Sequence, residues 1–200
     1  MNNTNNNPLN PYFQPVARVM ALAGGYALLF LAILISFEII ARKFFSYSVM
    51  GIDDLGGYVL AVCTSIGACY ALIIRSHARV DILATRLPSK GRSILNALTM
   101  VCMGAIAVFA TWRSILVLME SIEFNSIATN PLQTPLWLPQ SVWLAGMVFF
   151  AIVAFIYAVH AVWLLCVKPP LVNVFYGFAG DPDARVSPAE SAQRGGNSHE

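Results

Sequence analysis

The fold class follows from one uncharged run of 19 residues, Val19-Met-Ala-Leu-Ala-Gly-Gly-Tyr-Ala-Leu-Leu-Phe-Leu-Ala-Ile-Leu-Ile-Ser-Phe37. A helix needs about 20 apolar residues to cross the roughly 30 Å hydrocarbon core of a bilayer. Three more such runs follow, so the sequence predicts spanning helices at about 18–41, 55–75, 93–119 and 142–167. Because the runs are continuous and do not alternate, they favour helices over a β-barrel. We expect an all-α integral membrane protein with four transmembrane helices.

The composition also indicates a membrane protein. Of the 200 residues, 58% are hydrophobic and 11% are charged, whereas a soluble domain carries about a quarter charged residues. The net charge of +2 gives no indication of a nucleic-acid partner. We expect a membrane domain at 16–168, a disordered Asn-rich tail at 1–15 and a mostly disordered cytoplasmic tail at 169–200. The cysteines lie inside apolar runs and are interpreted as packing residues: Cys63, Cys69, Cys102 and Cys166.

The distribution of Lys and Arg predicts the orientation, because cytoplasmic segments of membrane proteins are enriched in both. The opposite side has only Arg42 and Lys43. Both termini are therefore expected to be cytoplasmic. The cytoplasmic side would hold nine basic residues: Arg18, Arg75, Arg79, Arg86, Lys90, Arg92, Lys168, Arg185 and Arg194.

The basic loop between the second and third helices carries a helical pattern of its own. Its apolar residues recur at helical spacing: Val80, Leu83, Ala84 and Leu87. The pattern predicts a short interfacial helix on the cytoplasmic leaflet. We assign Arg75, Arg79 and Asp81 to anchoring and subunit geometry, and not to binding of cargo. The alternative is a solvated, positively charged loop without a specific role.

The loop before the fourth helix is rich in proline. Pro135 and Pro139 lack an amide donor and disfavour helix at the preceding residue, so the segment 134–140 should be extended or turning. Trp137 is expected at the outer membrane interface. The loop is either a docking surface for a partner or a simple turn.

Few charges fall at membrane depth, and each has a structural explanation. Glu38 is four residues before Arg42, the spacing of a helical ion pair. Arg113 lies near the outer end of the third helix and can extend its guanidinium towards water. The alternative is a proton or ion pathway through Glu38 and Arg113, which would need more polar groups at the midplane than the sequence offers.

The second helix begins with two carboxylates and then presents small residues. Asp53 and Asp54 suit the positive end of a helix. Gly57 and Ala61 share one side with Ser65 and Ala68, and small residues at this spacing permit close helix contact in lipid. The contact is made either within the chain or with another subunit.

The sequence carries no enzyme constellation. We find no phosphate-binding Gly-rich loop and no nucleophile–base pairing, so we expect neither catalysis nor a cofactor or metal ion. Haem is the one cofactor that merits consideration, and a membrane cytochrome would need two inward histidines. His77 and His160 are expected at different depths, which disfavours haem.

Three segments, in this order, resemble a known family. They are Glu38-Ile-Ile-Ala-Arg42-Lys-Phe-Phe, then Asp54-Leu-Gly-Gly-Tyr with Arg75-Ser-His-Ala-Arg-Val-Asp-Ile-Leu and Leu87-Pro88, and finally Thr134-Pro-Leu-Trp-Leu-Pro-Gln140. Over residues 17–167 the chain resembles the small membrane subunit of tripartite ATP-independent periplasmic (TRAP) transporters. It departs from that pattern at Met50 and Asp53-Asp54, where the family often has Trp and Glu.

The resemblance implies a role as one subunit of a three-part secondary transporter in the bacterial inner membrane. A periplasmic binding protein would deliver an organic acid, and a large permease would move it with an ion gradient. This chain would bind the large permease and brace it. Two alternatives from other classes remain: a membrane anchor of a redox complex and a stand-alone channel or carrier.

Overall fold

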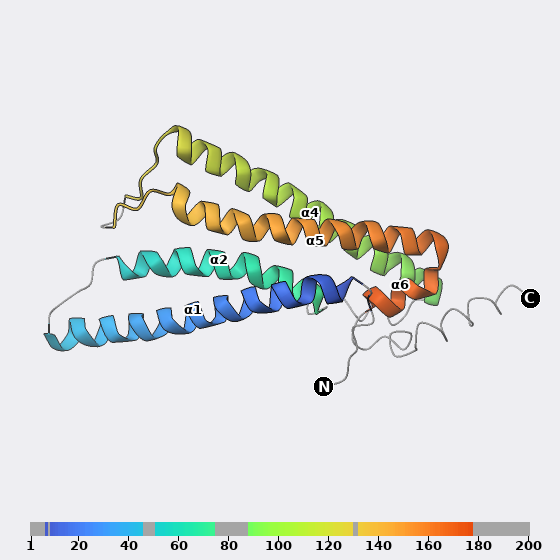
Figure 1. Cartoon of the computed structure of the whole chain (residues 1–200), viewed down its shortest axis with the longest axis horizontal. Coiled ribbons are helices and arrows are strands. Elements are labelled where there is room, and N and C mark those ends of the chain that lie inside the picture. Colours follow the sequence, from blue (N-terminus) through green and yellow to red (C-terminus); the bar gives the residue numbers. More distant parts are fainter. Residues whose placement is uncertain (1–6, 8, 46–50, 75–87, 130–131, 178–200) are drawn as a thin grey trace, which may run out of the picture. The chain divides into compact units, whose positions relative to one another are not determined.

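A computed structural model describes residues 7, 9–45, 51–74, 88–129 and 132–177 of the chain. Five helices occupy these residues: α1 (Asn10–Phe45), α2 (Ile52–Ile73), α4 (Ser89–Glu123), α5 (Trp137–Val167) and α6 (Pro169–Tyr176) (Figure 1). The described residues contain no β-strand, and one isolated antiparallel bridge joins Ile127 to Pro135. Four helices, α1, α2, α4 and α5, are long and apolar enough to cross a membrane. The all-α fold with four candidate spanning helices is thus confirmed.

Several helices extend beyond their expected ends. α1 begins at Asn10 and therefore includes residues that the sequence assigns to the N-terminal tail. α4 runs from Ser89 to Glu123, although uncharged residues end earlier at both sides. Polar residues can continue a helix past the apolar run, since the backbone hydrogen bonds do not depend on the side chains. The predicted interfacial helix at 80–87 and the residues after 177 lie outside the described part.

The chain divides into two compact units along its length. Unit 1 contains residues 1–14, 71–108 and 151–200, and unit 2 contains residues 15–70 and 109–150. Each of the long helices α1, α4 and α5 contributes one part to each unit.

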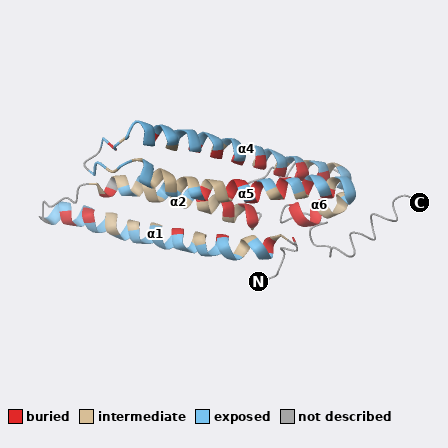
Figure 2. Cartoon of the chain, turned by 45° about the horizontal axis from the view of Figure 1, so that its top comes forward, coloured by how far each residue is buried: buried red, intermediate tan, exposed pale blue. Residues whose placement is uncertain are grey.

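The core of unit 1 forms where the first half of α4 meets the last half of α5. A Cβ atom at Gly104 would lie 3.0 Å from Ala158 Cβ and 3.3 Å from the carbonyl oxygen of Ala154. Such close approach of two backbones is the usual way helices associate in lipid. α6 adds to this core, and five of its eight residues are buried (Figure 2).

Unit 2 is also held by small residues. A Cβ atom at Gly146 of α5 would overlap Ser65 Oγ of α2. On α1, Gly24 offers its carbonyl oxygen to Cys63 Sγ at 3.3 Å. The hydroxyl of Thr111 donates to the carbonyl oxygen of Met147 at 3.1 Å and joins α4 to α5. Cys63 thus contacts the backbone of α1 and Cys69 is buried, whereas Cys102 and Cys166 are exposed.

Candidate functional site

The predicted helical ion pair is present on α1. Arg42 Nη2 lies 3.4 Å from Glu38 Oε2, and the two side chains are 56% and 5% exposed, respectively. The exposed guanidinium is therefore paired with a buried carboxylate, and the structural role of Glu38 stays a prediction. Arg113 is exposed on α4.

The predicted face of small residues on α2 divides into two parts. Gly57 and Ala61 are exposed, whereas Ser65 is buried against Gly146. The first pair is therefore open to lipid or to another chain, and Ser65 serves the internal contact. Asp54 is half-buried in the first turn of α2.

Some of the predicted residues are not described. Asp53 lies in the first turn of α2, but the description does not cover its side chain. Arg75, Arg79 and Asp81, with the histidine at position 77, lie outside the described residues. Their proposed roles stay predictions.

The proline-rich loop is more ordered than the sequence predicts. Pro135 pairs with Ile127 in a bridge, and the amide of Leu136 donates to the carbonyl oxygen of Ser126 at 3.0 Å. Trp137 then begins α5, so Pro139 is helical. The prediction of an extended or turning segment holds for residues 134–136 and is wrong for 137–140. Proline fits in the first turn because the amides there have no acceptor within the helix. Trp137 is 43% exposed at this helix start.

Gly51, which precedes α2, contacts the proline-rich loop and leads to a stability prediction. Its φ angle of 94° lies in the region that residues with a Cβ atom rarely adopt, and a Cβ atom would overlap Leu132 Cδ1. We expect Gly51→Ala to lower the free energy of unfolding by about 1 kcal/mol, measured by thermal unfolding in detergent.

Gly25→Ala is the matched control for that substitution. A Cβ atom at Gly25 has no neighbour within 4 Å, and alanine favours helix over glycine. The control should therefore unfold at the same temperature as the wild type or above it. Equal destabilisation by both variants would contradict the special role of Gly51.

A cluster of buried polar groups, which the sequence does not reveal, joins α6 to α4 in unit 1. Asn173 of α6 is fully buried and accepts a hydrogen bond from Asn96 Nδ2 at 3.0 Å. Its own Nδ2 donates to the carbonyl oxygen of Ser89 at 3.1 Å. The hydroxyl of Ser93 donates to the carbonyl oxygen of Pro169 at 2.8 Å. We call these residues the α6 cluster. Because these buried amides have hydrogen-bond partners, they avoid the free-energy cost of burying an unpaired polar group.

Two tyrosines of unit 1 extend this polar contact to α1 and α5. The hydroxyl of Tyr157 donates to Asn10 Oδ1 at 2.7 Å. Tyr176 Oη lies 2.6 Å from His160 Nδ1, and the two tyrosine rings meet edge to face with centroids 5.9 Å apart. His160, the one described histidine of the haem hypothesis, is thus hydrogen-bonded within the protein. The described residues contain no group of three or more His, Cys, Asp or Glu side chains that could hold a metal ion.

This arrangement joins α1, α4, α5 and α6 within unit 1. The hydrogen bonds of the α6 cluster join amides, hydroxyls and carbonyls, none of which is charged. The fold is that of a multi-pass membrane protein, and the hydrogen bonds described here join its helices.

The comparison with family models then identifies the family. The model for the DctQ component of tripartite ATP-independent periplasmic transporters matches residues 13–164. The chain belongs to this family, which contains small subunits of TRAP transporters and is not a family of enzymes. A search of curated proteins and a search of solved structures each found no match. The match confirms the resemblance seen in the sequence.

Proposed function

We propose that this chain braces the large permease of a TRAP-type secondary transporter in the bacterial inner membrane. The permease takes up an organic acid that a periplasmic binding protein delivers, and an ion gradient drives the uptake. The family match over residues 13–164 carries this proposal, because it includes part of every candidate spanning helix. A fixed neighbour is useful to a transporter that works by moving one part against another.

The surface of α1 supports a role in subunit contact. In the most apolar 18-residue stretch of α1 only 6% is buried, compared with 39% in the corresponding stretch of α5. In a membrane such a face contacts lipid or the helices of a neighbouring subunit. Its exposed residues recur at helical spacing: Val19, Leu22, Tyr26, Leu29, Ile33, Phe37, Ile40 and Phe44.

The orientation forms part of the same proposal. The excess of Lys and Arg supports cytoplasmic termini and a cytoplasmic interfacial helix at 80–87. Asp53, Asp54 and Trp137 would then face the periplasm, where they help to receive the binding protein.

Co-purification and uptake measurements test the function. We expect a tagged chain, expressed with the other components of its transport system, to retain a large hydrophobic permease in mild detergent. Liposomes should take up substrate only when this chain, the permease and the binding protein are all present. Uptake by this chain alone would instead support a stand-alone carrier. A haem absorption band that His160→Ala abolishes would support a redox anchor.

Charge reversal at the periplasmic ends of α1 and α2 should weaken assembly. Arg42→Asp places a second carboxylate one turn from the buried Glu38, and Asp54→Lys puts a positive charge at a positive helix end. We expect each to lower the yield of co-purified permease by about fivefold, equivalent to about 1 kcal/mol. Cys63→Ala is the control and should keep the wild-type yield. Equal yields from all three variants would refute this prediction.

A further inference from the structure

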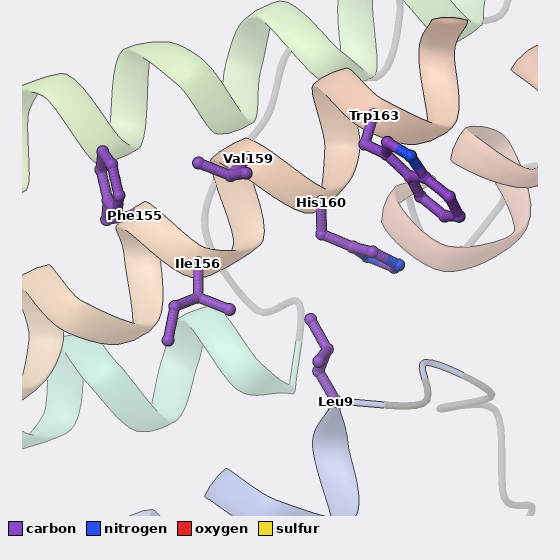
Figure 3. A pocket seen from close by; sticks show the side chains of 6 residues that line it. All are labelled: Leu9, Phe155, Ile156, Val159, His160 and Trp163. Atoms are coloured by element: carbon purple, nitrogen blue, oxygen red, sulfur yellow. The ribbon is translucent and has the colours of Figure 1, made fainter. Parts of the chain in front are cut away.

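Unit 1 has an apolar groove along α5. Its volume is about 330 Å³, and its lining residues are Leu9, Phe155, Ile156, Val159, His160 and Trp163. Figure 3 shows the side chain of Leu9 opposite Ile156 and His160, with Trp163 beside the histidine. The rings of His160 and Trp163 are stacked with centroids 6.1 Å apart. The groove is therefore apolar over most of its length and carries an imidazole and an indole towards the C-terminal end of α5.

We propose that this groove binds one acyl chain of an anionic phospholipid, whose phosphate lies near Lys90 and Lys168. α5 is a candidate spanning helix, so in a bilayer the groove would open to the hydrocarbon. An enclosed apolar cavity of about 150 Å³ already binds benzene, and this groove has more room. Its lining matches an acyl chain in polarity.

His160 offers a hydrogen bond to the same lipid. In a neutral histidine one ring nitrogen donates and the other accepts. When the Tyr176 hydroxyl donates to Nδ1, Nε2 carries the proton, and no described residue accepts a hydrogen bond from it. The ester carbonyls of a phospholipid lie between the acyl chains and the phosphate. Nε2–H of His160 is therefore suited to an ester oxygen.

The α6 cluster brings two lysines to one end of unit 1. Lys90 follows Ser89, whose carbonyl oxygen accepts from Asn173, and Lys168 precedes Pro169, whose carbonyl oxygen accepts from Ser93. Both lysines are exposed. Lys168 is five residues beyond Trp163, or about 8 Å along a helix, comparable to the thickness of the headgroup layer. Positive charge at this depth complements the phosphate of an anionic lipid.

Native mass spectrometry of the full chain in nonionic detergent tests the site. Phosphatidylglycerol and phosphatidylcholine with identical acyl chains are titrated separately. We expect one phosphatidylglycerol to bind about tenfold more tightly than phosphatidylcholine, because two lysines favour the anionic headgroup. Val159→Trp fills the groove and should abolish binding of both lipids. Val162→Trp, at an exposed residue of α5 outside the groove, is the control and should bind as the wild type does.

The lysines are tested separately, since their substitution does not disturb the groove. The double variant Lys90→Gln with Lys168→Gln should bind phosphatidylglycerol only as tightly as phosphatidylcholine. Three results would overturn the proposal: equal affinity of the wild type for the two lipids, equal binding by Val159→Trp and Val162→Trp, or a lipid-free dimer that Val159→Trp dissociates. If circular dichroism shows that Val159→Trp does not fold, two other measurements test the proposal. They are the preference of the wild type for phosphatidylglycerol and the loss of this preference in the double lysine variant.

Discussion

Asn173→Ala is expected to lower the free energy of unfolding by about 3 kcal/mol and to release α6 from unit 1. The side chain is fully buried, accepts from Asn96 and donates to the backbone of Ser89. Each buried group that loses its partner costs about 1–3 kcal/mol. Hydrogen–deuterium exchange should show faster exchange of the amides at 171–177, and thermal unfolding in detergent should give the loss of stability.

The double variant Asn96→Leu with Asn173→Leu is the matched control. It removes both amides together, and replacing both partners of a buried hydrogen bond by apolar groups is often nearly neutral. It should therefore be more stable than Asn173→Ala, although the carbonyl oxygen of Ser89 loses one donor. Amide protection of residues 171–177 at the wild-type level in Asn173→Ala would show that the α6 cluster does not hold α6.

Gly104→Leu is the second substitution with a large expected effect. It should lower the free energy of unfolding by about 3 kcal/mol. The new side chain would start 3.0 Å from Ala158 Cβ and 3.3 Å from the carbonyl oxygen of Ala154. The second neighbour is a backbone atom, so α4 and α5 must separate to make room. Unfolding by sodium dodecyl sulfate, followed by circular dichroism, measures this loss.

Gly67→Leu controls for the general effect of adding leucine to a spanning helix. A Cβ atom at Gly67 of α2 has no neighbour within 4 Å. This variant should match or exceed the wild type in stability, because leucine is the better helix former. Similar unfolding of the two leucine variants would mean that the contact at Gly104 tolerates a larger separation than the structure indicates.

The spanning helices could be predicted because their signal is local. Each depends on about 20 consecutive apolar residues, and the pair formed by Glu38 and Arg42 depends on a spacing of four. The predicted start of α5 at residue 142 is wrong for an equally local reason. Proline usually breaks a helix, but Pro139 lies in the first turn of α5, where the missing amide costs no hydrogen bond.

α6 could not be predicted because tertiary contacts stabilise it. It has eight residues, fewer than an isolated helix needs. Pro169 and Pro170 suit its first turn but are equally expected after the end of the preceding helix, so they do not by themselves predict a new one. Its key residue Asn173 is 77 positions from Asn96. No periodicity in the sequence joins residues so far apart. The first eight residues of the predicted tail, which was expected to be mostly disordered, form this helix.

The hydrogen bond between Asn10 and Tyr157 has a consequence for biosynthesis. The two residues are 147 positions apart in the chain, and a ribosome adds about 5–20 residues per second. Asn10 is therefore synthesised roughly 7–30 s before Tyr157. Throughout this interval the side chain of Asn10 lacks this partner. The contact between α1 and α5 in unit 1 thus forms late in synthesis. A nascent chain that stalls before Tyr157 cannot form this hydrogen bond.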